Sequence, residues 1–174
     1  MKALTIIGAG WLLLVTTAVR SQAPNDAQIA SIVVTANQVD IDAGKLAEPK
    51  SHNAEVKAFA QRMITDHSAV IKAGSELLAK LNVTPQDNPT SQSLKSDGDK
   101  NLAHLKSLEG AAFDKAYMNR EVDYHTQVIG ALDKTLIPST TNPEFKALLV
   151  KARPTFIAHL EEAKRIQASL GKKK

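Results

Sequence analysis

Apolar residues recur every three to four positions along five segments of this chain, and that period constrains its fold more than any other feature. Between residues 112 and 136, for example, Phe113, Tyr117, Val128 and Leu132 fall on one face of a helix. The same period predicts helices over residues 26–48, 51–81, 91–108, 112–136 and 143–170. No stretch of the sequence alternates as a strand would. We therefore expect an all-α fold.

Prolines and their neighbours indicate where these helices begin and end. Pro49 is expected to end the first helix, and the sequence NVTPQDNPTS separates the second helix from a short one. Asn142 and Pro143 suit the N-cap and first position of the last helix, which Pro154 should kink. Four long helices, with a short crossover helix between the second and third of them, predict a ferritin-like four-helix bundle. A tandem of helical hairpins is the alternative.

The beginning of the chain has the layout of a secretory signal peptide. Lys2 precedes an apolar run over residues 3–19, and small and polar residues follow it. We expect cleavage near residues 21–23, where the adjacent Pro24 disfavours the last of these positions. The signal peptide would then comprise residues 1–23, and residues 24–174 would form a single helical domain. An uncleaved amino-terminal anchor is the alternative.

Composition excludes several classes of function. The chain has 22 basic and 18 acidic residues, and loss of a signal peptide containing Lys2 and Arg20 would leave 20 basic residues against the same 18. This near balance gives no indication of nucleic-acid binding. Cysteine is absent from the sequence, which excludes disulfides, thiolate metal sites and cysteine nucleophiles.

Five polar side chains fall on the apolar faces of the long helices. They are Asp40 on the first long helix, His67 on the second, Glu121 and His125 on the third, and His159 on the fourth. Because burial of an unpaired carboxylate costs several kcal/mol, we expect these groups to contact one another. The helical rise places Glu121 and His159 at one level, but it leaves Asp40 and His67 about 7 Å apart along the bundle.

These five inward residues have two interpretations, and the sequence leaves both open. Imidazole nitrogens and carboxylate oxygens suit a transition metal such as Fe, Mn, Zn or Cu, and bundle cores hold such sites. The ligands would then be Asp40, His67, Glu121, His125 and His159. Alternatively, the same side chains form a buried hydrogen-bond network that fixes the register of the helices. His52 and His104 lie off the apolar faces and are expected at the surface.

Four motifs of the sequence resemble a known family. They are QVDIDAGKLA, VKAFAQRMITDH, GAAFDKAYMNREVDYH and ARPTFIAHLEEA, and together they extend from about residue 26 to residue 170. In this order they are similar to the bacterial envelope proteins of the domain-of-unknown-function family DUF4142. The resemblance implies a ferritin-like bundle that a Gram-negative bacterium exports to the periplasm or the outer membrane, and it implies no known activity. The histidines within these motifs are His67, His125 and His159.

These observations predict a non-catalytic protein of the cell envelope, a binding or stress-related module that associates with the envelope or a membrane surface. The sequence contains no nucleotide-binding loop and no hydrolase motif, so we expect no enzyme activity. The alternative is a periplasmic protein that binds a divalent transition metal through the inward residues. A ferritin-like oxidase is less favoured, because Ile64, Val122 and Phe156 stand where the di-iron Glu-x-x-His motif requires glutamate.

Overall fold

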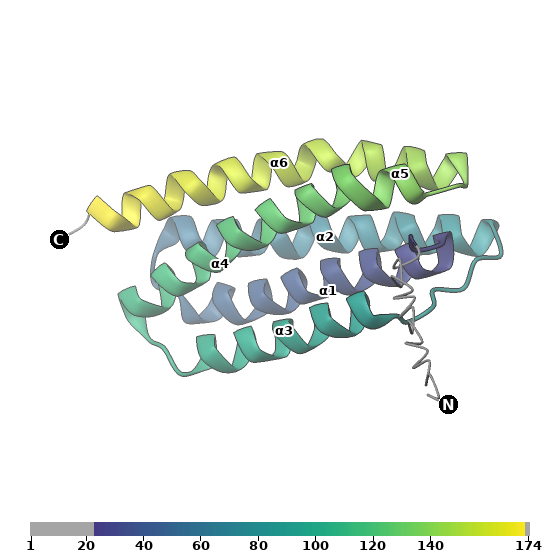
Figure 1. The fold of residues 1–174 in the computed structure, drawn as a ribbon. Coiled ribbons are helices and arrows are strands. Elements are labelled where there is room, and N and C mark those ends of the chain that lie inside the picture. Colours follow the sequence, from purple (N-terminus) through teal and green to yellow (C-terminus); the bar gives the residue numbers. More distant parts are fainter. Residues whose placement is uncertain (1–22, 173–174) are drawn as a thin grey trace, which may run out of the picture.

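The computed structural model describes residues 23–172, and this part of the chain is entirely helical (Figure 1). The predicted signal peptide, residues 1–23, lies outside the described residues except for Ala23. The helices are α1 (Asp26–Lys50), α2 (Ala54–Lys80), α3 (Pro89–Lys106), α4 (Gly110–Ala131), the π-helical turn η1 (Leu132–Leu136), α5 (Ile137–Ser139) and α6 (Pro143–Lys172). The all-α prediction is therefore confirmed. Within the same residues, none of these helices combines the length and apolar character needed to span a membrane.

Asparagine side chains begin four of the helices. Asn25 accepts a hydrogen bond from the backbone N–H of Gln28 at the start of α1. Asn53, Asn88 and Asn142 accept equivalent bonds from the first turns of α2, α3 and α6. Each such cap pairs a backbone donor that the helix itself leaves free, and each stabilises its helix by about 1 kcal/mol. Local sequence therefore determines where these four helices begin.

The helices pack as two antiparallel pairs with α3 along one side (Figure 1). The short turn after Lys50 makes α1 and α2 neighbours, and α4 packs in the same way against α6. The two pairs meet mainly through α2 and α6, while α3 lies against α1 and runs in the same direction. The result is a helical bundle in which all four long helices contribute to one core.

Most of the predicted helix boundaries lie within three residues of the observed ones, and two differences have an identifiable physical reason. Pro49 lies inside the last turn of α1 and does not end it, because only one more residue follows and little helical hydrogen bonding is lost there. The predicted helix over 112–136 is not regular to its end, since η1 interrupts it and Ile137 N–H donates to the Leu132 carbonyl five residues earlier. Pro138 follows directly, and the wider turn gives its ring room beside the preceding carbonyls.

A polar layer divides the core of the bundle into two apolar clusters. On α1 the residues of one cluster include Ile32 and those of the other include Ala43, and Asp40 lies between them in the chain. The other three long helices repeat this order, with a polar residue of the inward set between the two clusters. The flanking residues are Met63 and Leu78 on α2, Met118 on α4 and Leu132 directly after it in η1, and Phe156 and Ala163 on α6. The inward residues therefore share one level of the bundle, which we call the polar centre.

Gly44 allows α1 and α2 to approach closely, and its replacement tests this contact. A Cβ atom at Gly44 would lie 2.9 Å from the backbone oxygen of Ala60, which cannot move aside. We expect Gly44→Ala to lower the free energy of unfolding by about 1–3 kcal/mol, as overpacking does in other cores. Urea denaturation measures this change.

Gly130→Ala is the matched control, because nothing lies within 4 Å of the Cβ it would add. It should raise the free energy of unfolding by up to about 1 kcal/mol through helix propensity. Equal effects of the two substitutions would show that the α1–α2 contact is not tight at Gly44.

Candidate metal centre

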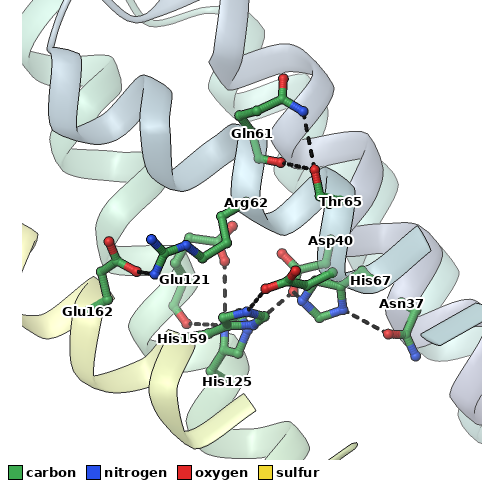
Figure 2. A network of polar contacts seen from close by, with 11 residues as sticks. Asn37, Asp40, Gln61, Arg62, Thr65, His67, Glu121, His125, His159 and Glu162 are labelled. Carbon is green, nitrogen blue, oxygen red and sulfur yellow. Dashed lines mark hydrogen bonds and ion pairs between the residues drawn. The ribbon is translucent and has the colours of Figure 1, made fainter. Parts of the chain in front are cut away.

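The polar centre brings together side chains from all four long helices (Figure 2). Its members are Asp40 from α1, His67 from α2, Glu121 and His125 from α4, and His159 from α6, and each residue is between 1% and 3% exposed. His52 and His104, by contrast, are exposed. Three imidazoles and two carboxyl groups therefore share a space that water barely reaches.

Asp40 and His67 are much closer than the expected offset of about 7 Å along the bundle. The two residues are in contact, with His67 Nε2 lying 2.9 Å from Asp40 Oδ2. The expectation was wrong because it ignored the direction of the side chains, which in a helix tilt toward the N-terminus. In the antiparallel pair α1–α2 this tilt carries Asp40 away from the connecting turn and His67 back toward it, so the two side chains converge.

The three histidine rings form a triangle. Their centroids lie 5.3 Å apart for the two pairs that include His159 and 5.6 Å apart for His67 and His125. Phe156 covers one side of this triangle, since its ring stacks on His67 with a centroid distance of 5.3 Å and an interplanar angle of 7°. The rings are thus held by one another and by an apolar neighbour.

Two of the histidines donate a ring proton outward to a fixed oxygen. His67 Nδ1 lies 2.8 Å from Asn37 Oδ1, and the Asn37 amide nitrogen donates to the Val33 carbonyl, which orients the amide. His125 Nδ1 lies 3.0 Å from the backbone oxygen of Glu121. Both acceptors lack a proton to give, so in each ring the Nδ1 atom is the donor.

The third histidine follows the same rule with its other nitrogen. His159 Nε2 lies 2.9 Å from Oδ2 of Asp66, a carboxylate whose side chain is 37% exposed at the edge of α2. The neutral forms of the three rings therefore carry their lone pairs on His67 Nε2, His125 Nε2 and His159 Nδ1. His67 Nε2 and His125 Nε2 face Asp40 Oδ2 at 2.9 Å and 3.5 Å, and the buried His159 Nδ1 has no hydrogen-bond partner among the described residues.

Donor atoms gather in two overlapping groups at this level. One nitrogen from each of His67, His125 and His159 forms a set whose members lie within 4.8 Å of one another. Asp40, Glu121 and His125 form a second such set, and Asp40 Oδ2 also lies 3.5 Å from His125 Nε2. Asp40 Oδ2 therefore faces two imidazole nitrogens at once. Three nitrogens and a carboxylate are a donor set that suits a divalent transition metal.

Burial and close charges shift the protonation of this centre strongly. Burial opposes ionisation of Asp40, but the neighbouring His67 and His125 outweigh it and hold the pKa of Asp40 below its usual value. Burial and the charge of Asp40 raise the pKa of Glu121 to about 8. Burial lowers the pKa of His125, but Asp40 and Glu121 overcome this and raise it to about 9. Without a metal, the proton on His125 compensates the charge of Asp40 at neutral pH.

His159 behaves differently from His125. Burial and the nearby His67 and His125 lower the pKa of His159 to about 4, although its bond to Asp66 acts in the opposite direction. His159 is therefore neutral at pH 7 and has a free lone pair, as a metal ligand requires.

The sequence interpretation missed Asn37 and gave no role to Asp66. Both are hydrogen-bond acceptors that orient histidines, and their positions depend on how helices pack. The spacing of three residues between Asn37 and Asp40 places them on one helix face and was a usable signal. The Tyr124 hydroxyl donates to the Ala36 carbonyl at 2.9 Å.

Fold and site together define an all-helical bundle with a buried, histidine-rich polar centre. The model of the family described as "Domain of unknown function (DUF4142)" matches residues 14–166, and the chain belongs to this family. Among solved structures, the chain is similar to CopM in the Cu(II)-bound form, with a TM-score of 0.67 and 16% sequence identity. The match covers 85% of this chain and 99% of CopM, so the two proteins share a fold. No curated protein matches the sequence.

The pKa values of the polar centre predict how stability depends on pH in the metal-free protein. Glu121 and His125 have pKa values of about 8 and about 9, raised from 4.5 and 6.5, so the folded state retains protons that the unfolded state releases. Stability should therefore fall as pH rises through 6.5–8, with a slope of up to about 1.4 kcal/mol per pH unit for each retained proton.

Urea denaturation across this pH range, with a chelator present, measures the slope. Glu121→Gln keeps the size of the side chain but removes its titration, so this variant should show a shallower slope. A wild-type stability that does not change between pH 6.5 and 8 would contradict the assigned protonation states.

Proposed function

We propose that this protein binds one divalent transition metal ion at the polar centre. The ligands are His67 Nε2, His125 Nε2 and His159 Nδ1, with a carboxylate oxygen of Asp40 as the fourth donor. The observation that carries this proposal is the shared pattern of the three histidines. Each directs one nitrogen to an orienting oxygen and its other, buried nitrogen toward the middle of the polar centre, which is the arrangement of metal-binding histidines.

A structural hydrogen-bond network explains this pattern less well. A network that stabilises a core pairs its buried polar atoms, since each unpaired one costs about 1–3 kcal/mol. Here His159 Nδ1 has no hydrogen-bond partner among the described residues, and a single oxygen of Asp40 faces both His67 Nε2 and His125 Nε2. A metal ion would satisfy these atoms together, and it would displace the proton that His125 holds in the metal-free protein.

We propose Cu(II) as the ion that binds most tightly. Imidazole donors suit copper, and among divalent ions of the first transition row Cu(II) generally forms the strongest complexes with such sites. The shared fold with CopM in its Cu(II)-bound form supports this choice. Zn(II), Fe(II) and Mn(II) are the competing ions.

We propose a binding role rather than catalysis. The cavity beside the centre has a volume of only about 10 Å³, and Phe156 and Tyr124 are among its lining residues, so a bound ion has little room for a substrate. A ferritin-like arrangement, with α3 as the crossover helix, and export to the periplasm or outer membrane complete this interpretation. The mass of the mature protein in a periplasmic extract tests the export.

Metal content tests the central proposal. Untagged protein is loaded with Cu(II), dialysed and analysed for its elements. We expect about one copper ion per chain, and almost none in the double variant His67→Ala/His125→Ala, because three nitrogen ligands would fall to one. The matched control is His52→Ala/His104→Ala, which removes two exposed histidines and should retain the wild-type stoichiometry.

A second readout uses the wild-type protein alone and does not depend on whether the variant folds. Cu(II) at a free concentration 100 times its Kd should raise the free energy of unfolding by about 2.7 kcal/mol. Wild-type protein that takes up no metal and gains no stability would overturn the proposal and leave the polar centre as a hydrogen-bond network.

Asp66 provides a separate test of the orienting bonds. Asp66→Ala removes the acceptor of His159 Nε2 from a partly exposed position, so the fold should be little affected. We expect copper affinity to fall by about 10–100-fold, as it does when such partners are lost elsewhere. Asp42→Ala removes a half-buried carboxylate of α1 that accepts a hydrogen bond from Gln38 and is bonded to no histidine, so it should leave affinity unchanged. Competition with a chelator of known affinity measures both variants, and equal losses would argue against a specific role of Asp66.

A further inference from the structure

A groove separate from the polar centre runs between α1, the start of α3 and the end of α4. Its volume is about 570 Å³, within the range of pockets that hold small organic molecules. The groove exists because α1 and α4 touch little, each being packed against another helix along most of its length. It is therefore a feature of the helix arrangement and not a gap left by one small side chain.

Among the described residues, none with a charged side chain lines this groove. Charged residues make up 23% of the sequence, so their absence from a partly open surface feature is notable. A cation or anion in the groove would find no opposite charge to compensate the water it loses. The walls therefore favour a neutral occupant.

Apolar and hydrogen-bonding side chains share the walls. Ile32, Leu94 and Val128 supply apolar surface, while Gln28 and Gln127 supply amides that can both donate and accept hydrogen bonds. Small-molecule sites combine these features, with apolar walls for affinity and a few polar groups for orientation. An occupant would need an apolar body and one or two polar groups.

Two further features mark the groove as more than an apolar surface. The π-helical turn η1 lines it through Thr135 and Leu136, and such turns are frequent at functional sites. Its inner end shares Ala36, Tyr124 and Val128 with the small cavity at the polar centre. The Tyr124 side chain thus forms a wall between the groove and the buried histidines.

We propose that this groove binds a neutral organic molecule that has an apolar body and one or two hydrogen-bonding groups. The groove and its occupant are independent of the metal proposal, since none of the histidines of the polar centre lines the groove.

A matched pair of fluorescent probes tests the proposal on the purified protein. N-phenyl-1-naphthylamine is neutral, and 8-anilino-1-naphthalenesulfonate has the same aromatic framework with an added negative charge. We expect saturable binding of about one neutral probe per chain, and an affinity at least roughly tenfold lower for the anionic probe, because no basic side chain lines the groove. Failure of the neutral probe to bind, or equal affinities for the two probes, would overturn the proposal.

Two variants locate the bound probe. Ala131 is an exposed wall residue, so Ala131→Trp should fill the groove and weaken binding of the neutral probe by roughly tenfold or more. Ala58→Trp makes the same change at an exposed position of α2 outside the groove and should leave binding unchanged. Gln127→Glu adds a charge to the wall with almost no change in shape, and it should also weaken binding of the neutral probe.

The remaining outcomes are equally decisive. Equal binding by the Ala131→Trp and Ala58→Trp variants would place the probe elsewhere and overturn the proposal. Sedimentation of the same proteins tests whether the groove is instead a contact between two copies of the chain. In that case the wild-type protein would be a dimer, and Ala131→Trp would make it a monomer. That result would also overturn the small-molecule assignment.

Discussion

The buried carboxylate of Asp40 is the interaction on which the arrangement of the bundle depends. Its charge lies at the middle of α1, away from water, and among the described residues only His67 of α2 and His125 of α4 form ion pairs that compensate it. Breaking a buried pair of this kind leaves an uncompensated charge and typically costs 3–5 kcal/mol. The three helices can therefore adopt only a register that keeps these side chains at one level, whereas apolar contacts alone would tolerate sliding.

The sequence predicted the helices and their inward faces well, because both follow from local chemistry. The 3.6-residue period of apolar side chains sets the faces, and asparagine caps and prolines set most ends. The inward orientation of Asp40 and the histidines followed from the same period. The period does not predict the level along the bundle at which side chains from different helices meet, because this level depends on side-chain tilt in antiparallel helices.

The acceptors that orient the histidines and the π-helical turn show a second limit of prediction from the sequence. Asn37 and Asp66 matter only because the packing of α1 on α2 and of α2 on α6 places a histidine beside each. The η1 turn combines a local cause, Pro138, with a tertiary one, because Leu132 and Leu136 must both reach the core. Single-sequence reasoning finds the first kind of cause and misses the second.

The long separation along the chain between the groups at the polar centre has a consequence for biosynthesis. Asp40 and His159 stand near opposite ends of the helical region, and the histidines come from three different helices. Of the five groups at the polar centre, only Glu121 and His125 are close together in an extended polypeptide, which therefore offers no three-histidine chelate. If the chain crosses a membrane in the unfolded state, it travels without capturing ions from the compartment where it is made. Any metal bound at the polar centre would then be determined by the compartment where folding is completed, and not by the one where translation takes place.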